Sequence, residues 1–262
     1  MFDMFYGDAS GKRMTGILLL SLLACGCAGG AVTESGRHPD PAAMLRPALR
    51  ETHRIVATAR MDLSTVQGHY PLRAALILQR PSYLRLEMLP VIGTPDFFLS
   101  ATPREMRIWI PSQGEFYVGQ PSAENMSRFL PWTLNLEDLV MILSGSFPPL
   151  DGAHWSYGDS AEGGALRVDM KTVSGPSQTI WMENSGRLTR FVRYGSDGRE
   201  VYSVRYEDYT PGLFLARKIL IQRADNTLSA FVEYSDVNIE ETADFSVFAL
   251  PAPDGAKILR LD

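Results

Sequence analysis

The chain contains few residues that could support catalysis or metal binding, and each shortage excludes a class of protein. Among its 262 residues are only two cysteines, Cys25 and Cys27, so the long region after them has no disulfide, no thiol nucleophile and no sulfur ligand for a metal. The four histidines are scattered, and neither a Gly-x-Ser-x-Gly nucleophile motif nor a phosphate-binding glycine loop is present. We therefore expect no enzyme, no metal and no cofactor.

Strong charge of one sign and long apolar runs are also missing. The formal net charge is −5, acidic and basic residues are interspersed, and no Lys/Arg-rich run is present, which argues against a nucleic-acid partner. With 45% hydrophobic and 21% charged residues, the composition is that of a globular protein. The four tryptophans are expected in the core or at its rim, with an aromatic carbohydrate platform as the alternative.

A basic pair and a short apolar run precede the first cysteine. The run, residues 17–24, is far shorter than the roughly 20 residues that a membrane-spanning helix needs. It ends in Leu-Leu-Ala before Cys25 and resembles the lipobox of bacterial lipoproteins, in which the cysteine becomes the lipid-carrying N-terminus. The resemblance implies a signal peptide at 1–24 and a lipid anchor on Cys25. Cys27 is a rival acceptor, and a buried apolar helix is the alternative to a signal.

Small and polar residues follow the cysteines. Residues 25–40 are expected to form a lipidated, flexible tether, and residues 41–262 to form one domain. Gly26 follows Cys25, whereas in bacterial lipoproteins an aspartate there commonly means retention at the inner membrane. Its absence implies an outer-membrane location facing the periplasm.

Most of the domain consists of short segments in which apolar and polar residues alternate. In one of them, Leu84, Leu86 and Met88 point to one side of a strand and charged residues point to the other. Turn sequences such as Asn-Ser-Gly and Ser-Asp-Gly separate the segments and leave no room for crossover helices, so neighbouring strands are expected to be antiparallel. The pattern predicts a mainly β fold of about 11–12 strands with one apolar face.

Two stretches in the middle of the chain have helical spacing. Residues 122–130 have apolar residues on one side and Ser122 as N-cap, and residues 136–143 are apolar nearly all round with Asn135 as N-cap. Both helices are expected to cover the apolar face of the sheet. They either fill a solid core or form a lid over an apolar cavity.

Several short motifs resemble the LolA/LolB family of bacterial outer-membrane lipoprotein localisation proteins, most closely the receptor LolB. The motifs are Leu-Arg-Leu-Glu at 84–87, Pro-Val-Ile-Gly-Thr at 90–94, Phe-Leu at 98–99, Leu-Glu-Asp-Leu at 136–139, and a tail at 244–256 in which a Phe precedes a Pro-Gly turn. The resemblance implies an unclosed antiparallel β-barrel covered by short helices, which binds acyl chains in an apolar concavity. We expect the chain to be a monomer.

The resemblance also implies two sets of functional residues. In the receptor, a loop between two early strands presents an apolar side chain that is needed to put lipoproteins into the membrane. The matching residues here are Val91 and Ile92, for which packing into the core is the alternative. The residues expected to line the acyl-chain cavity are Leu84, Leu86, Met88, Phe98, Ile108, Leu139, Met141 and Leu143.

These expectations combine into one function. The chain would be a membrane-anchored periplasmic lipoprotein that binds acyl chains and acts in the transfer or insertion of lipoproteins or lipids at the outer membrane. A LolA-like periplasmic carrier would be its partner. The alternative is a structural lipoprotein that serves as a protein-docking scaffold without bound lipid.

Overall fold

The structure is a computed structural model, and it describes residues 50–132, 134–159, 166–210 and 215–261. The expected signal peptide at 1–24, the tether at 25–40 and the lipid acceptor Cys25 with its rival Cys27 lie outside the described residues. Within the described ranges, no helix is both long enough and apolar enough to cross a membrane.

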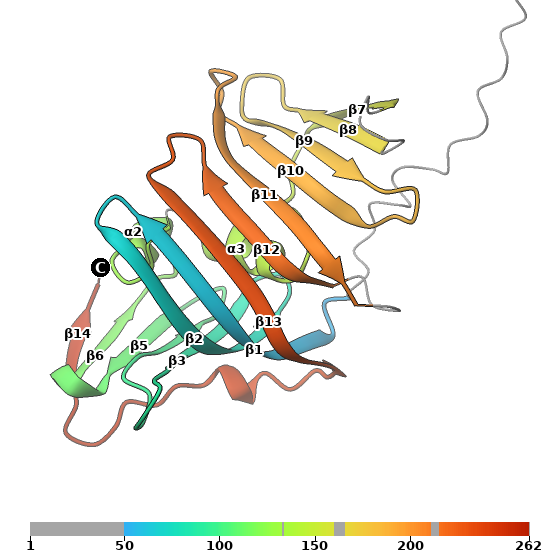
Figure 1. The fold of residues 1–262 in the computed structure, drawn as a ribbon. Helices are drawn as coiled ribbons and strands as arrows, with labels where there is room; N and C mark the ends of the chain where they lie inside the picture. Colours follow the sequence, from blue (N-terminus) through green and yellow to red (C-terminus); the bar gives the residue numbers. More distant parts are fainter. Residues whose placement is uncertain (1–49, 133, 160–165, 211–214, 262) are drawn as a thin grey trace, which may run out of the picture. The chain divides into compact units, whose positions relative to one another are not determined.

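The described strands form one 14-stranded sheet (Figure 1). In chain order, the strands are β1 (His53–Thr65), β2 (Gly68–Gln79), β3 (Tyr83–Leu89), β4 (Phe98–Ala101), β5 (Met106–Ile110), β6 (Glu115–Gly119), β7 (His154–Asp159), β8 (Leu166–Lys171), β9 (Ser177–Met182), β10 (Leu188–Tyr194), β11 (Glu200–Tyr209), β12 (Ala216–Arg223), β13 (Leu228–Glu241) and β14 (Lys257–Arg260). Their order across the sheet is β14-β6-β5-β4-β3-β2-β1-β13-β12-β11-β10-β9-β8-β7.

The mainly β, antiparallel and unclosed architecture is confirmed, with two or three strands more than the sequence predicted. β7 and β14 lie at the two ends of the sheet and do not pair with each other, so the sheet is open. Every neighbouring pair is antiparallel except β6 and β14, which are parallel. That exception corrects the expectation of antiparallel neighbours throughout. β14 is parallel because a long segment after β13, and not a tight turn, leads to it.

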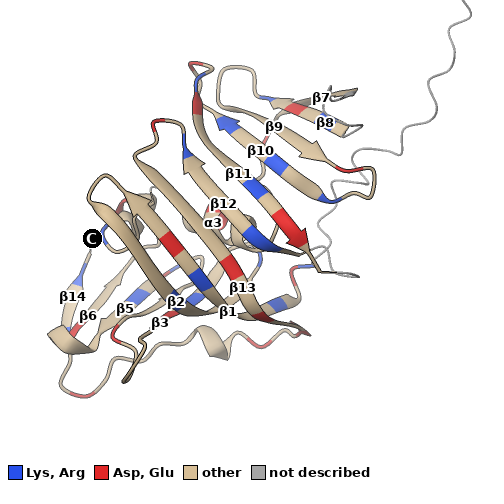
Figure 2. Ribbon diagram, viewed as in Figure 1, with Lys and Arg blue, Asp and Glu red and all other residues tan. Residues whose placement is uncertain are grey.

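Side chains on each strand alternate between two faces of the sheet. The side that packs against the helices is called the inner face, and the opposite side is called the outer face. Ala57 pairs with Leu76 on the inner face, whereas the next pair, Val56 and Ile77, is on the outer face. The inner positions are almost fully buried and form one core, in which each large apolar side chain contributes about 1.5–3 kcal/mol. Figure 2 shows that residues of both charge signs are distributed over many strands.

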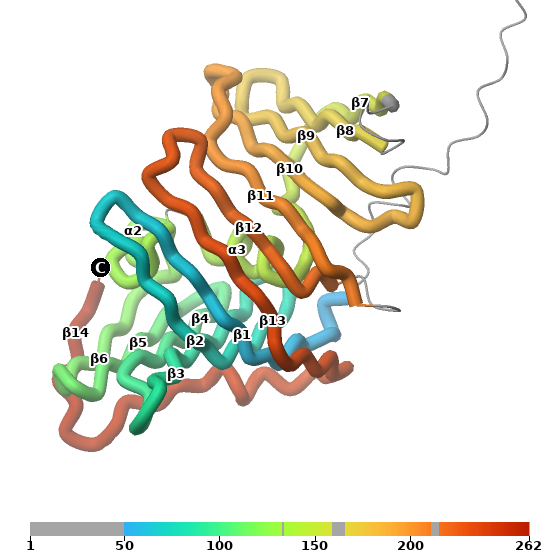
Figure 3. Tube along the Cα trace, in the orientation of Figure 1, coloured from blue at the N-terminus to red at the C-terminus, as the bar shows by residue number. Residues whose placement is uncertain are grey.

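Two short helices cover the inner face, as Figures 1 and 3 show. They are α2 (Ala123–Ser127) and α3 (Leu136–Leu143), and two 3₁₀ turns, η1 (Pro111–Gln113) and η2 (Ser246–Phe248), lie elsewhere in the chain. The predicted N-caps are confirmed. The Ser122 hydroxyl accepts a hydrogen bond from the Asn125 amide at 3.1 Å, and Asn135 Oδ1 accepts one from the Asp138 amide at 2.7 Å.

The segment that follows β13 crosses the outer face of β3, β4 and β5, and residues 245–250 of it are called the C-terminal strap. Three side chains of the sheet donate hydrogen bonds to its backbone: Arg85 Nη1 to Val247 O at 2.9 Å, Ser100 Oγ to Phe248 O at 2.5 Å, and Arg107 Nη1 to Leu250 O at 3.2 Å. Within the strap, the Phe248 side chain is buried against Tyr83, whereas the Phe245 side chain remains partly exposed. The strap therefore shields the outer face at this end of the sheet.

We predict that Phe248→Ala lowers the free energy of unfolding by about 3 kcal/mol or more, because it removes a buried aromatic ring that contacts Tyr83 and the Arg54 guanidinium. The matched control is Phe245→Ala. Its ring also contacts Tyr83, but it is partly exposed, so we expect a cost of about 1 kcal/mol or less. Urea denaturation measures both values. Equal losses from the two variants would mean that the strap does not pack as described.

Candidate functional site

The inner face under α3 contains most of the residues that were expected to line a cavity. Leu84 and Leu86 of β3 lie on it, and the register places Leu86, Leu99 and Ile108 side by side on three adjacent strands. Leu139 and Leu143 of α3 belong to the same buried cluster, and Met88 packs against it while partly buried. The apolar surface thus exists, and α3 covers it.

Two residues of the expected set are placed differently from the rest. Phe98 pairs with Glu87 and with Trp109, so it lies on the outer face, away from the other side chains of the set. Met141 lies on α3 but is only partly buried, and it is absent from the buried side of that helix. The sequence reasoning missed Leu99, which occupies the inner position beside Leu86. The sequence prediction therefore placed the inward-pointing side chain of β4 at Phe98, one residue before its actual position at Leu99.

The C-terminal end of α3 is satisfied almost completely by hydrogen bonds. Gly145, with φ of 74°, follows the helix, and its amide donates to Ile142 O while the Ser146 amide donates to Met141 O. This is the Schellman arrangement, and it satisfies two of the carbonyls that every helix end leaves free. The left-handed φ at this position favours glycine.

Three side chains from outside the helix also donate hydrogen bonds to carbonyls at and just after this helix end. Tyr234 donates to Leu143 O at 2.8 Å, Arg80 Nη2 donates to Ser144 O at 2.9 Å, and Tyr206 donates to Ile142 O and Ser146 O. Arg80 Nε also donates to Ser144 Oγ at 2.8 Å. These side chains, called the α3 anchor, fix the helix to β11, to β13 and to the turn that follows β2 through hydrogen bonds to its backbone.

Burial sets the charge state of the α3 anchor. Arg80 is only 6% exposed, and desolvation lowers its pKa to about 10, so its guanidinium stays positive at neutral pH. Its charge is favourable there because the C-terminal end of a helix is the negative end of the helix dipole. Burial raises the pKa of both Tyr206 and Tyr234, which therefore remain hydrogen-bond donors. None of the three was recognised from the sequence, although a tyrosine in a row of inward apolar residues signals a hydroxyl that needs a buried partner.

The loop between β3 and β4 projects two apolar side chains into solvent. Val91 is 97% exposed and Ile92 is 90% exposed, so the alternative in which both pack into the core is excluded. The base of the loop is fixed, because Asp96 Oδ1 and Oδ2 accept hydrogen bonds from the amide and hydroxyl of Ser112 at 2.7 and 2.5 Å. An apolar pair held at the tip of such a loop is able to touch a membrane or another protein.

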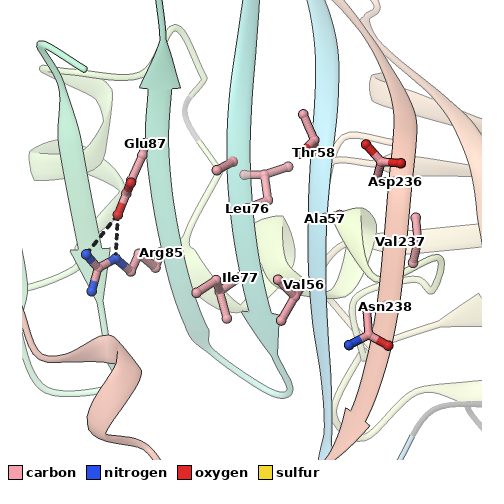
Figure 4. Close-up of a pocket in the computed structure, with 11 residues that line it drawn as sticks. Val56, Ala57, Thr58, Leu76, Ile77, Arg85, Glu87, Asp236, Val237 and Asn238 are labelled. Carbon is pink, nitrogen blue, oxygen red and sulfur yellow. Dashed lines mark hydrogen bonds and ion pairs between the residues drawn. The ribbon is translucent and has the colours of Figure 1, made fainter. Parts of the chain in front are cut away.

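A separate pocket of about 440 Å³ lies on the outer face (Figure 4). Figure 4 shows Val56 and Ile77 between an ion pair on one side, in which Arg85 Nη2 lies 2.8 Å from Glu87 Oε1, and Asp236 on the other. The pocket shares no residue with the expected acyl-chain set, and it opens on the side of the sheet away from α3. Its charged rim makes it unsuitable as the dry surface that a hydrocarbon chain needs.

The part of the chain that the structure describes contains no group of three or more His, Cys, Asp or Glu side chains that could bind a metal ion. The described residues instead form an apolar surface, a covering helix and an exposed apolar loop.

Comparison with solved structures assigns this architecture to a known fold. A domain from Vibrio parahaemolyticus, described as that of an outer membrane lipoprotein-sorting protein, matches with a TM-score of 0.57 and 15% identity over 79% of this chain and 94% of that one. A LolA superfamily protein from Nitrosomonas europaea matches with a TM-score of 0.54 and 13% identity, over 80% and 97% of the two chains. A DUF1329 family protein from Desulfovibrio piger has a TM-score of 0.55, 13% identity and coverages of 80% and 98%.

The chain therefore has a LolA-like fold. No family model matches the sequence, and no curated protein matches it. At 13–15% identity, the similarity shows how the chain folds.

We predict that Arg80→Leu loosens α3 without unfolding the sheet, because it leaves the Ser144 carbonyl buried without its donor, at a cost of about 1–3 kcal/mol. Amide hydrogen exchange at residues 144–146 should accelerate about tenfold or more, while exchange in β1 and β13 stays nearly constant. Arg60→Leu, at an exposed position of β1, is the control and should change neither. Equal acceleration throughout the sheet would show that α3 does not open by itself.

Proposed function

We propose that the chain binds acyl chains of lipids or lipoproteins between the inner face of the sheet and α3, and acts in their transfer or insertion at the bacterial outer membrane. The single observation that supports this most directly is the covered apolar face. The inner surface of β2 and β3 is buried and apolar, and the element packed against it is a short helix fixed at one end by side-chain hydrogen bonds.

The energetics favour exchange between the helix and a ligand. Burying a long acyl chain is worth on the order of 10 kcal/mol, at about 0.8 kcal/mol per methylene. Leu139 and Leu143 occupy the same surface in the closed state, so a ligand gains only the difference between its own burial and theirs. That difference permits release, which a transfer protein requires.

The location and partners belong to the same proposal. Cys25 would carry the lipid anchor, residues 1–24 would be removed, and the domain would face the periplasm from the outer membrane. Val91 and Ile92 would contact the bilayer during insertion, since they are exposed at the tip of a loop with a fixed base. A LolA-like carrier would deliver the acyl chains. The lipoprotein-sorting description of the Vibrio domain supports this assignment.

The cargo is tested by extracting non-covalent lipids from the full chain, purified in a steroid-based detergent that has no alkyl chain to compete. Mass spectrometry of the solvent extract should detect an acylated species at about one per chain. A lipid attached covalently to Cys25 stays with the protein and is not counted. If the extract contains no acylated species and a protein partner co-purifies, the chain is the docking scaffold and not the carrier.

We predict that the double change Val91→Glu and Ile92→Glu abolishes transfer of an acylated protein to vesicles. Two carboxylates at the tip cannot enter the hydrocarbon region, whereas the free energy of unfolding should change by less than about 0.5 kcal/mol because both side chains are exposed. The matched control is Val173→Glu, at a residue that is also highly exposed but lies in the turn between β8 and β9. Equal loss of transfer in the control would remove the special role of the β3–β4 loop.

A further inference from the structure

The inner face is not apolar throughout, because one row of side chains across β9, β10 and β11 is polar. Register pairs Gln178 with Arg193, and Arg193 with Tyr202, so the three lie side by side on three adjacent strands. The neighbouring row on the same face, Ile180, Phe191 and Val204, is entirely apolar. A polar row therefore borders a continuous apolar surface.

Gln178 and Tyr202 are buried, Arg193 is partly exposed, and the hydrogen-bonding groups of the row are only partly satisfied. Gln178 is 1% exposed; its Nε2 donates to Pro148 O at 3.4 Å, while its Oε1 has no hydrogen-bond partner among the described residues. Burial raises the pKa of Tyr202 to about 12, so its phenol stays neutral. A buried acceptor without a partner is uncommon and costs about 1–3 kcal/mol, so it needs an explanation.

The negative charge near this row comes from the covering helix. The hydrogen bond from Tyr206 of β11 to Ile142 O places α3 over that strand, and Asp138 lies one helical turn before Ile142. The Asp138 charge raises the pKa of Tyr202, and the Arg193 charge lowers the pKa of Asp138. Burial raises the pKa of Asp138, and the Arg193 charge together with the hydrogen bond from Asn135 lowers it in part. Displacement of α3 would take this carboxylate away and leave Arg193 facing an apolar surface without a nearby anion, which is unfavourable.

The same row extends to β7, the edge strand of the sheet. Trp155 pairs with Met170, and Tyr157 pairs with Val168, so both aromatic side chains of β7 lie on the inner face. They are 40% and 46% exposed, whereas their partners on β8 are buried. Because Met170 also pairs with Gln178, the row runs from the exposed edge of the sheet to Arg193.

We propose that the ligand of the inner face is an amphiphile with an anionic head group, and that this head group takes the place of Asp138 beside Arg193 when α3 is displaced. A hydroxyl of the head group would donate to Gln178 Oε1, and the acyl chain would lie along the apolar row of Ile180, Phe191 and Val204. The carboxylate of the helix is thus a stand-in for the ligand's head group. This inference rests on the proposed acyl-chain binding and adds the class of ligand.

The test compares two probes that share a 16-carbon acyl chain, lysophosphatidylglycerol (anionic) and lysophosphatidylcholine (net neutral), both below their critical micelle concentrations. Binding to the full chain is measured by titration calorimetry. We expect the anionic probe to bind about tenfold more tightly or better, as a charge-assisted contact would produce. Arg193→Gln should abolish this preference, and Arg193→Lys should retain most of it.

Two further variants separate the head-group contact from a general effect on folding. Arg190→Gln is the matched control, since it lies on the same strand but on the outer face, where its guanidinium stacks over Trp181 at 5.0 Å, and it should leave the preference unchanged. Asp138→Asn should tighten the binding of both probes by a similar factor, because opening no longer separates a charge pair. Thermal unfolding of each variant confirms that it is folded.

The outcomes distinguish the two proposals. If neither probe binds the unaltered chain, the acyl-chain function fails, and this inference fails with it. If both probes bind with equal affinity, the function stands and the head-group site is wrong. A preference that survives Arg193→Gln also overturns the assignment, since the selectivity would then arise elsewhere.

Discussion

The structure depends on one constraint: an open sheet with an apolar inner face must be covered, and a short helix covers it. α3 buries its leucines against β2 and β3 and other inner strands, and Arg80, Tyr206 and Tyr234 donate hydrogen bonds to the carbonyls at its end. Hydrogen bonds of this kind contribute about 1 kcal/mol each, and much more is lost when one partner is left buried alone. Side-chain packing and side-chain hydrogen bonds therefore hold α3 against the sheet, without the backbone hydrogen bonds that join neighbouring strands.

That arrangement links stability to the proposed function. The surface that stabilises the closed domain is the same surface that would bind an acyl chain, so closure and binding compete for it. In the proposed mode of binding, the polar row of Gln178, Arg193 and Tyr202 would add a second competition, between the carboxylate of Asp138 and a ligand's head group. The outer face has a different role, because the C-terminal strap seals it beside β3 to β5, and the loop with Val91 and Ile92 extends away from a fixed base.

Local features of the sequence predicted local features of the structure well. The alternation at Leu84 and Leu86 identified the inner face, and Ser122 and Asn135 identified the helix starts, because both signals act within a few residues. Contacts between distant residues were not predictable. The α3 anchor joins residues 60–91 positions apart, and the polar row requires the exact pairing of three strands. Phe98 was predicted to lie on the inner face but lies on the outer one. Side chains of a strand alternate between the two faces, so an error of one residue in the alternation places a side chain on the wrong face.

The central claim is that an acyl chain replaces α3 on the inner face. Nuclear Overhauser effects between a 16-carbon fatty acid and the methyl groups of the isotope-labelled protein test it most directly. The account predicts contacts from the hydrocarbon chain to Leu84, Leu86 and Ile108, together with loss of the contacts between those residues and Leu139 or Leu143. Persistence of the helix contacts, with the fatty acid instead near Val56 and Ile77 of the outer pocket, would contradict it.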